Sequence, residues 1–320
     1  MKKIAIDRHE RSAEYVRAAE RLGVEYYLVD CLADDIINQL EDAKSLIWHW
    51  HHGDYAQKRV AKSIIYAAEK KGICVYPNID TCETFDDKVA QKYLLEANGL
   101  PLVETHVFLD RTKAENFLKC CEYPIVTKLA GGAGSTNVKM VKSEKEGLRV
   151  CSERFDSYYR MSMNWGKEKN PKKALWYFKN EDNRRYMGED KGYVLFQSFL
   201  PNNTYDIRVT IIGEEKAVIF KRYVRDNDFR ASGSGKIDYE IGEKDKEAIK
   251  IGFEAAHKLK AQTVAFDFAY DSDMSLKIIE MSYGFVSKAV FDAKGYYTED
   301  GKWHGNPVSV EEEIVLMLSK

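Results

Sequence analysis

The stretch "VAFDFAYDSDMSLKIIEMSYGF", residues 264–285, reads as two apolar strands joined by a polar turn. Asp267 and Glu280 interrupt these strands, and on neighbouring strands they could lie side by side across a sheet. Facing carboxylates repel one another and resist burial unless a cation lies between them. Mg²⁺ on nucleotide phosphates would resolve that conflict. Projection into solvent is the alternative, against which the apolar flanks "AFDF" and "IIEM" argue.

Length and composition bound the class of protein. A chain of 320 residues is long enough for two or three packed units. Its net charge of −2 does not indicate binding to nucleic acid or to an anionic membrane. The six cysteines form no C-x-x-C pair, so free thiols in a reducing compartment are expected. The start "MKKIAIDRHE" lacks the apolar region of a signal peptide, and no run is long enough to cross a bilayer. A cytoplasmic protein is expected.

The order of strand and helix patterns indicates three units. Residues 1–80 alternate short strands with amphipathic helices, which predicts a Rossmann-like parallel α/β domain. Residues 81–192 are expected to form a small α+β unit, and residues 193–320 a larger antiparallel sheet with helices. A polar, aromatic-rich insertion at about 151–191 is expected either to close over a substrate or to mediate a homodimer.

The strongest local signal is "PIVTKLAGGAGSTNV", residues 124–138. A strand delivers Lys128, and the loop after it contains Gly131, Gly132, Gly134 and Ser135. Glycines let successive backbone N–H groups approach an anion, and the lysine adds a point charge for the same phosphates. A flexible glycine hairpin beside a surface lysine is the alternative. The dinucleotide fingerprint, the P-loop and the kinase signatures are absent, which disfavours those three classes.

Two further segments carry polar residues beside apolar ones. In "LFQSFLPNNTYDIRV", a linker with Gln197, Phe199 and Leu200 could hold an adenine, and Asp206 could accept from ribose hydroxyls; an ordinary hairpin with a surface acid is the alternative. "FKRYVRDNDFRASGSG" places arginines beside a small-residue loop, among them Arg222 and Arg230. Their forks match phosphate or carboxylate oxygens, although a charged strand end facing water would look similar.

These segments follow one another along the chain, after Lys88 of "FDDKVAQKY" at an expected helix start. In this combination and order they resemble the ATP-grasp superfamily. The resemblance runs from about Thr81 to the end, and "YDIRV" and "NDFRASGSG" bring it nearest to the RimK-like (ribosomal-protein glutamate ligase) and glutathione-synthetase-like branch. It implies an ATP-grasp fold preceded by the Rossmann-like domain. The implied contacts are Lys88, Lys128 and the loop from Gly131 to Thr136 for the ATP phosphates; Gln197, Phe199 and Leu200 for adenine; Asp206 for ribose; Arg222 and Arg230, with Lys128, for the transferred phosphate; and Asp267 and Glu280 for Mg²⁺ or Mn²⁺.

The resemblance also implies the reaction. A small-molecule or peptide carboxylate would be phosphorylated by ATP to an acyl phosphate, and an amine would then displace phosphate to form an amide. One position departs from the family, whose second metal strand reads E-x-N where this chain has Glu280, Met281 and Ser282. A serine hydroxyl is a weaker metal ligand than an amide carbonyl. Phosphotransfer to a hydroxyl, or ATP binding without catalysis, are the alternative functions.

The segment "IWHWHHGDY", residues 47–55, gathers imidazoles at the end of an expected strand. His49 and His51 fall on one side and His52 on the other, with Asp54 close behind. This is not a sufficient ligand set for zinc. Because strand carboxyl ends in parallel sheets open onto ligand crevices, contact with a substrate is the expectation, with packing as the alternative.

Overall fold

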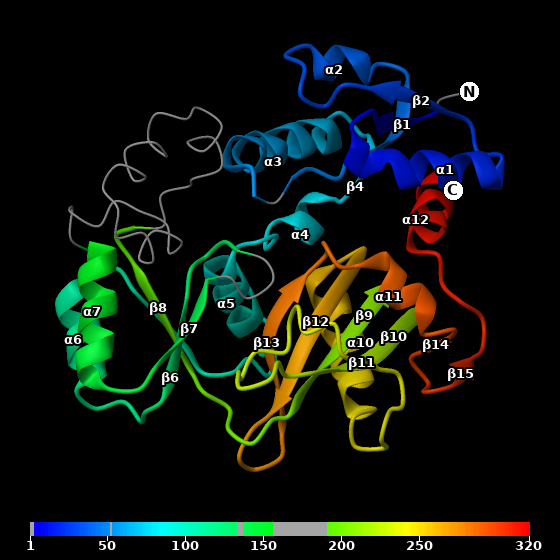
Figure 1. Ribbon diagram of the computed structural model, residues 1–320. Coiled ribbons are helices and arrows are strands. Elements are labelled where there is room, and N and C mark those ends of the chain that lie inside the picture. Colours follow the sequence, from blue (N-terminus) through cyan, green and yellow to red (C-terminus); the bar gives the residue numbers. More distant parts are fainter. Residues whose placement is uncertain (1–2, 52, 133–136, 156–190) are drawn as a thin grey trace.

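The structure is a computed structural model that describes residues 3–51, 53–132, 137–155 and 191–320, and it contains three sheets (Figure 1). His52, Gly134, Ser135 and most of the predicted insertion therefore lie outside the described residues. The insertion's first residues, 151–155, complete a helix of the small unit. The fold is a mixture of α/β and α+β parts, as the sequence predicts.

The N-terminal sheet is parallel, with strands in the order β2-β1-β3-β4, which confirms the Rossmann-like α/β prediction. Its elements are β1 (Lys3–Asp7), η1 (Glu10–Ser12), α1 (Ala13–Leu22), β2 (Tyr26–Val29), α2 (Ile36–Gln39), β3 (Ala43–Ile47), α3 (Tyr55–Lys70), β4 (Cys74–Tyr76) and α4 (Ile79–Cys82). Asp54 caps α3 by accepting a hydrogen bond from Gln57 N at 3.1 Å. After β1 the chain forms β2 on one side of it, and then crosses over to form β3 on the other side.

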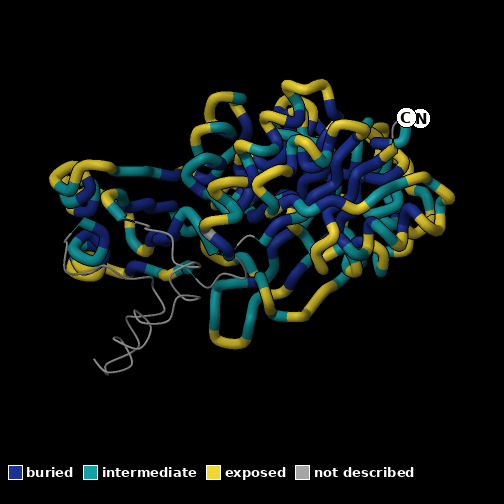
Figure 2. Tube along the Cα trace, turned by 90° about the horizontal axis from the view of Figure 1, so that it is seen from above, coloured by how far each residue is buried: buried dark blue, intermediate teal, exposed yellow. Residues whose placement is uncertain are grey.

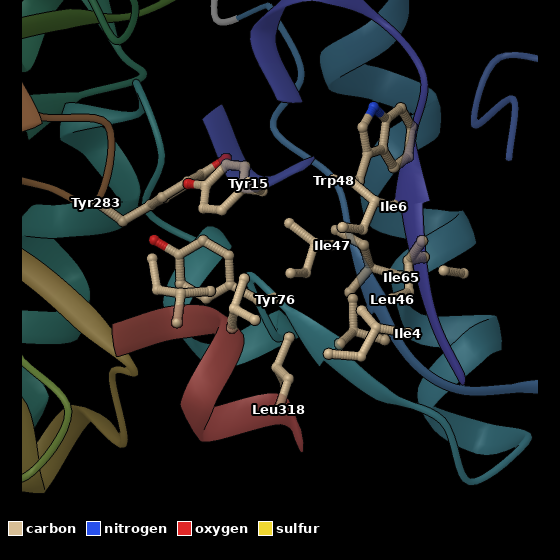
Figure 3. Packing of buried hydrophobic residues seen from close by; sticks show 14 of the residues in the cluster. Ile4, Ile6, Tyr15, Leu46, Ile47, Trp48, Ile65, Tyr76, Tyr283 and Leu318 are labelled. Carbon is tan, nitrogen blue, oxygen red and sulfur yellow. The ribbon is translucent and has the colours of Figure 1, made fainter. Parts of the chain in front are cut away.

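The last helix, α12 (Val310–Ser319), returns to this N-terminal unit and packs against α1 and β4. Figure 3 shows Leu318 of this helix close to the buried Tyr76, in the same cluster as Ile4 and Ile47. Tyr283, which follows β13, belongs to the cluster as well. The C-terminal helix therefore completes the core of the unit in which the chain begins, whose buried residues are dark blue in Figure 2.

The small unit has an antiparallel sheet in the order β5-β8-β6-β7. Its elements are β5 (Thr105–Phe108), α6 (Arg111–Leu118), β6 (Ile125–Lys128), β7 (Val138–Val141), α7 (Glu144–Phe155) and β8 (Val194–Ser198). The sequence places the strand at 194–198 with the larger unit, but β8 pairs with both β5 and β6. Strand β8 therefore belongs to the small unit, because its backbone N–H and C=O groups are hydrogen-bonded to β5 and β6.

The large sheet runs β13-β12-β9-β10-β14-β15, and β11 pairs with β10. Its elements are α5 (Lys88–Ala97), β9 (Tyr205–Ile212), β10 (Lys216–Tyr223), β11 (Ile237–Asp238), α10 (Glu247–Leu259), β12 (Thr263–Tyr270), β13 (Leu276–Ser282), α11 (Ser287–Asp292), β14 (Tyr296–Tyr297) and β15 (Trp303–His304). Alternate residues such as Ile207 and Val209 pack with Phe253 of α10. The residues between them face the other side, where the charged groups lie. In the part of the chain that the structure describes, no helix is long and apolar enough to span a membrane.

Candidate nucleotide site

One face of the large sheet gathers charged side chains from four neighbouring strands. The strand register pairs Asp206 with Arg222, Arg208 with Asp267, and Asp267 with Glu280. Because directly paired residues project to the same face, all five side chains lie on the side opposite α10. The predicted juxtaposition of Asp267 and Glu280 across the sheet is confirmed.

A β-bulge on β13 brings Glu280 to this face. The register shifts between Asp267 and Phe268, so that Asp267 pairs with Glu280 while Phe268 pairs with Ile278. Ile279 is the extra residue, and both it and Glu280 line the cleft, whereas Ile278 and Met281 on either side lie in the core. A bulge bends its strand locally and re-aims a side chain, and bulges are frequent next to active sites.

Two arginines hold the buried acids on this face. Arg208 donates from Nε and Nη2 to Asp267 at 2.7 and 2.8 Å, and Arg222 donates in the same forked way to Asp206 at 2.7 and 2.6 Å. Arg222 Nη2 also lies 2.7 Å from Asp267 Oδ2. Burial raises the pKa of Asp267, but the two guanidiniums outweigh it and lower the pKa to about 2. Burial dominates at Asp206 and raises its pKa to about 6, against the lowering by Arg222.

Two lysines from neighbouring elements approach Glu280 and the strand that carries it. Lys88 is the first residue of α5, and its Nζ lies 3.2 Å from Glu280 Oε1 and donates to Gly132 O at 3.1 Å. Lys128 ends β6 and donates from Nζ to Ile279 O at 3.1 Å. Burial lowers the pKa of Lys128 to about 8, against the opposing effect of Glu280. The fold therefore brings both predicted phosphate lysines to the predicted metal acids.

An apolar wall continues the cleft away from the charges. The cleft has a cavity volume of about 120 Å³ and opens widely to solvent. Among the residues that line it are Val126, Val138, Gln197, Phe199, Leu200, Val224, Phe229, Ala269 and Ile279, together with the charged Lys128, Asp206, Arg222, Asp267 and Glu280. Phe199 and Phe229 meet edge to face with ring centroids 5.7 Å apart. Gln197 lines the cleft and donates from Nε2 to Thr105 Oγ1 at 3.0 Å.

The two predicted phosphate arginines line the same cleft, but carboxylates already hold them. Arg222 serves Asp206 and Asp267, and Arg230 donates to Asp228 at distances down to 2.6 Å. Of the glycine loop, Gly131 and Gly132 are described. A polyphosphate would therefore meet cations that are already oriented by hydrogen bonds, which limits the entropy lost on binding.

The predicted metal ligands suit a hard cation in part. Asp267 and Glu280 offer oxygen atoms on one register pair, the donor type that Mg²⁺ prefers. Glu280, with 32% of its side chain exposed, faces the cleft more openly than Asp267, whose oxygens both accept from arginine. Ser282 Oγ accepts a hydrogen bond from Gly284 N at 3.1 Å. Among the described residues, no group of three or more His, Cys, Asp or Glu side chains is placed to hold a metal.

Sequence reasoning assigned no role to Arg208, although it lies at the centre of the charged face. The signal was present in "YDIRV", because residues two apart on a strand share a face and Arg208 therefore had to lie beside Asp206. What the sequence could not supply was the register that places Asp267 opposite it.

The histidine segment packs where the N-terminal unit meets the large sheet. His49 follows β3 and lies edge to face with Tyr283, with ring centroids 5.7 Å apart. Ser12 Oγ accepts from His49 N at 3.4 Å, and His51 Nδ1 accepts from Gly53 N at 3.0 Å. This segment therefore adjoins the end of β13, which carries Glu280.

Solved structures with the same architecture are ATP-grasp proteins. They include the biotin carboxylase domain of Hydrogenobacter thermophilus 2-oxoglutarate carboxylase, bound to MgADP and bicarbonate (TM-score 0.63, 15% identity, 99% of this chain and 69% of that one). A RimK domain ATP-grasp protein of Sphaerobacter thermophilus aligns with a TM-score of 0.59 and 13% identity over 99% of both chains. The ATP-grasp ligase PsnB, complexed with a precursor peptide and AMPPNP, gives 0.57 and 13% over 99% of this chain and 97% of that one.

The sequence matches no protein-family model and no curated protein. The structural likeness nevertheless shows that this chain has the ATP-grasp fold, which confirms the fold that the sequence resemblance implies.

Proposed function

We propose that the protein is an ATP-dependent ligase that joins a carboxylate to an amine. The observation that carries this proposal is the cleft in which an apolar wall meets Lys128 and the Asp267–Glu280 pair, with Lys88 bound to Glu280 in an adjoining pocket, in a chain with the ATP-grasp fold. The bound groups named for neighbouring structures, MgADP and AMPPNP, support a nucleotide in such a cleft.

In this proposal the adenine lies against Phe199 and Leu200, with Gln197 beside it, and the phosphates extend toward Lys128 and Lys88. Glu280 and the remaining lone pairs of Asp267 would hold Mg²⁺. The metal would neutralise phosphoryl charge and orient the terminal phosphate for in-line displacement. Asp206 faces the same cleft, and its oxygens could still accept from a ribose hydroxyl while Arg222 holds them.

The proposed reaction has two displacements. A carboxylate oxygen of the acid attacks the γ-phosphorus, the bond from that phosphorus to the β,γ-bridging oxygen breaks, and ADP leaves. The amine nitrogen then attacks the acyl carbon, the carbon–oxygen bond to phosphate breaks, and the nitrogen loses a proton. Lys128, Arg222 and Arg230 would stabilise the charge on the transferred phosphoryl group, since positioned cations supply most of the catalysis in phosphoryl transfer.

The acid or amine is proposed to bind at the carboxyl edge of the N-terminal sheet. The chain changes direction between β1 and β3, and ligands of open α/β sheets bind where that reversal occurs. Asp7 ends β1 as a buried carboxylate and lies 2.9 Å from His9 Nδ1, and Ser12 Oγ lies 3.4 Å from Asp7 Oδ2. His49 follows β3 at the same edge and adjoins the end of β13 through Tyr283.

Hydroxylamine trapping tests the reaction class. Purified protein is incubated with ATP, Mg²⁺, hydroxylamine and a panel of amino acids, dicarboxylates and peptides, and ADP and hydroxamate are measured together. A ligase forms both in equal amounts with at least one acid, because hydroxylamine intercepts the acyl phosphate. ADP with a phosphorylated hydroxyl compound would instead identify a phosphotransferase. ATP binding without ADP or hydroxamate from any acid would contradict the ligase proposal.

A further inference from the structure

Asp86 lies between α4 and α5 and contacts the base of the glycine loop. Its Oδ1 accepts a hydrogen bond from Gly132 N at 2.6 Å, and 11% of its side chain is exposed. Its backbone has a φ of 50°, in the left-handed region that non-glycine residues seldom occupy. The hydrogen bond from Gly132 N and the nearby Lys58 ammonium hold its carboxylate in place.

Gly132 is held from both sides by residues of this short segment. Its N–H donates to Asp86, and its carbonyl accepts from Lys88 Nζ at 3.1 Å. Its own φ of 121° is open to glycine alone. The amide that Asp86 occupies thus lies beside a lysine that also contacts Glu280, at the phosphate end of the proposed nucleotide site.

Asp86 is also tied to the N-terminal unit. Lys58, on α3, donates from Nζ to the backbone oxygen of Asp86 at 2.5 Å, and this nitrogen lies 3.5 Å from Asp86 Oδ2. The carboxylate of Asp86 therefore links helix α3 to the glycine loop. Lys58 would still neutralise the carboxylate if the Gly132 amide were withdrawn from it.

We propose that Asp86 is a positioning residue whose carboxylate occupies the Gly132 amide in place of a phosphate oxygen and yields it when nucleotide binds. An amide of a glycine loop beside a lysine suits an anion, and a protein carboxylate satisfies the same donor. An arriving phosphate competes for that N–H and repels the carboxylate, which Lys58 then retains. This inference rests on the proposed function, because it assumes that nucleotide phosphates reach this loop.

The test compares nucleotide affinities by isothermal titration calorimetry. Asp86→Asn removes the charge while keeping the size, and asparagine tolerates the left-handed backbone. The variant is expected to bind ATP and ADP on the order of tenfold more tightly, the effect of one charge-assisted hydrogen bond. Its affinity for adenosine, which has no phosphate, is expected to stay unchanged, which a merely structural role would not explain.

The matched control is Glu83→Gln. Lys62 of α3 contacts Glu83 as Lys58 contacts Asp86, with Nζ 2.7 Å from the backbone oxygen and 3.2 Å from Oε2. Among the described residues, Glu83 makes no hydrogen bond to the glycine loop. This variant loses the same charge and is expected to bind ATP as the wild type does. Lys58→Met is expected to weaken ATP binding in the wild-type background and to change it little beside Asp86→Asn.

The outcomes separate the two proposals. Wild-type binding of ATP with equal or weaker binding by Asp86→Asn would overturn the role of Asp86 and leave the proposed function standing. An equal shift for adenosine, or the same gain from Glu83→Gln, would overturn it as well. If neither the wild type nor Asp86→Asn binds ATP, the proposed function itself fails.

Discussion

The two faces of the large sheet differ in chemistry although the same strands build both. On one face Val209 and Phe266 pack against α10 in a continuous apolar core. On the other, one residue away in each strand, Arg208 and Asp267 form a fork-to-fork ion pair in reach of the cleft. Burial of apolar surface stabilises the first face, whereas every buried charge on the second face needs a partner of opposite sign. Substitutions on the two faces should therefore fail in different ways.

The apolar face should respond through stability, and Phe266→Ala should have the largest effect of all. Phe266 is fully buried, and truncation leaves a cavity beneath α10. The free energy of unfolding is expected to fall by about 4 kcal/mol. Urea unfolding followed by circular dichroism measures this change. A loss below about 1 kcal/mol would mean that this face is not the close-packed core described here.

On the polar face, Glu280→Gln should reduce activity more than stability. Glu280 is partly exposed, and its buried partner Lys88 keeps a hydrogen bond to Gly132 O, so the free energy of unfolding is expected to fall by about 1–2 kcal/mol. Loss of a metal ligand is expected to lower ADP formation on the order of hundredfold and to raise the Mg²⁺ concentration needed for half-maximal rate. Glu254→Gln, at an exposed pair with Lys258, is the control of equal charge change. Full activity in Glu280→Gln would contradict the metal assignment.

Arg208→Met should lower both stability and activity, because Arg208 donates two hydrogen bonds to Asp267, a carboxylate that is almost fully buried. Asp267 would keep Arg222 alone, and its pKa should rise from about 2 as burial gains weight. The free energy of unfolding at neutral pH is expected to fall by about 2 kcal/mol. A carboxyl with a lowered pKa stabilises above its unfolded pKa of about 4, and that stability is lost as pH falls toward 2. Acid titration of stability should therefore show a smaller loss in the variant, whereas the exposed Arg17→Met should behave as wild type.

The pH dependence of ATP binding tests Lys128, the buried lysine at the rim of the polar face. Its pKa of about 8, lowered by burial, leaves it charged below pH 8 and neutral above. Because the ammonium attracts phosphate and the amine does not, affinity should fall above pH 8 by up to about tenfold per pH unit. Calorimetry of ATP binding from pH 7 to 9.5 measures this. Lys128→Met should bind weakly and without that pH dependence, and a wild-type profile flat to pH 9.5 would exclude Lys128 from the phosphate site.

Ser282→Asn should produce the smallest effect. Ser282 follows Glu280 on the same strand face, and its hydroxyl already accepts from Gly284 N. An amide carbonyl is a better oxygen ligand, so the Mg²⁺ requirement of ADP formation is expected to fall by a few-fold, on the order of 0.5 kcal/mol. A rise in that requirement would show that Ser282 serves the Gly284 turn alone.

The sequence predicts which residues of a strand share a face, but it does not predict how distant strands pair. Alternation in "YDIRV" and "AFDF" is a local property, so the placement of Asp267 among core residues was predictable from the residues alone. The bulge at Ile279 was not, because it depends on how β13 pairs with β12. The arginine forks on Asp206 and Asp267 likewise require a register that links strands far apart in the chain.

The same distinction explains the misplaced strand β8. Its own residues predict a strand correctly, but its partners β5 and β6 precede it by many residues and an insertion. The helix α12 returns to the N-terminal unit for a similar reason, since Leu318 fills a core that begins at Ile4. Local pattern predicts element type, and long-range packing decides to which unit an element belongs.

The most direct test of the account is calorimetric titration of the wild type with ATP, in Mg²⁺ and again in EDTA. The polar face described here predicts one ATP bound per chain, with an affinity that falls when the metal is removed. In Glu280→Gln the affinity should be low already and should be the same in Mg²⁺ and in EDTA. Absence of ATP binding at millimolar concentrations, or binding that is unaffected by both EDTA and Glu280→Gln, would contradict the claim that this face is a metal–nucleotide site.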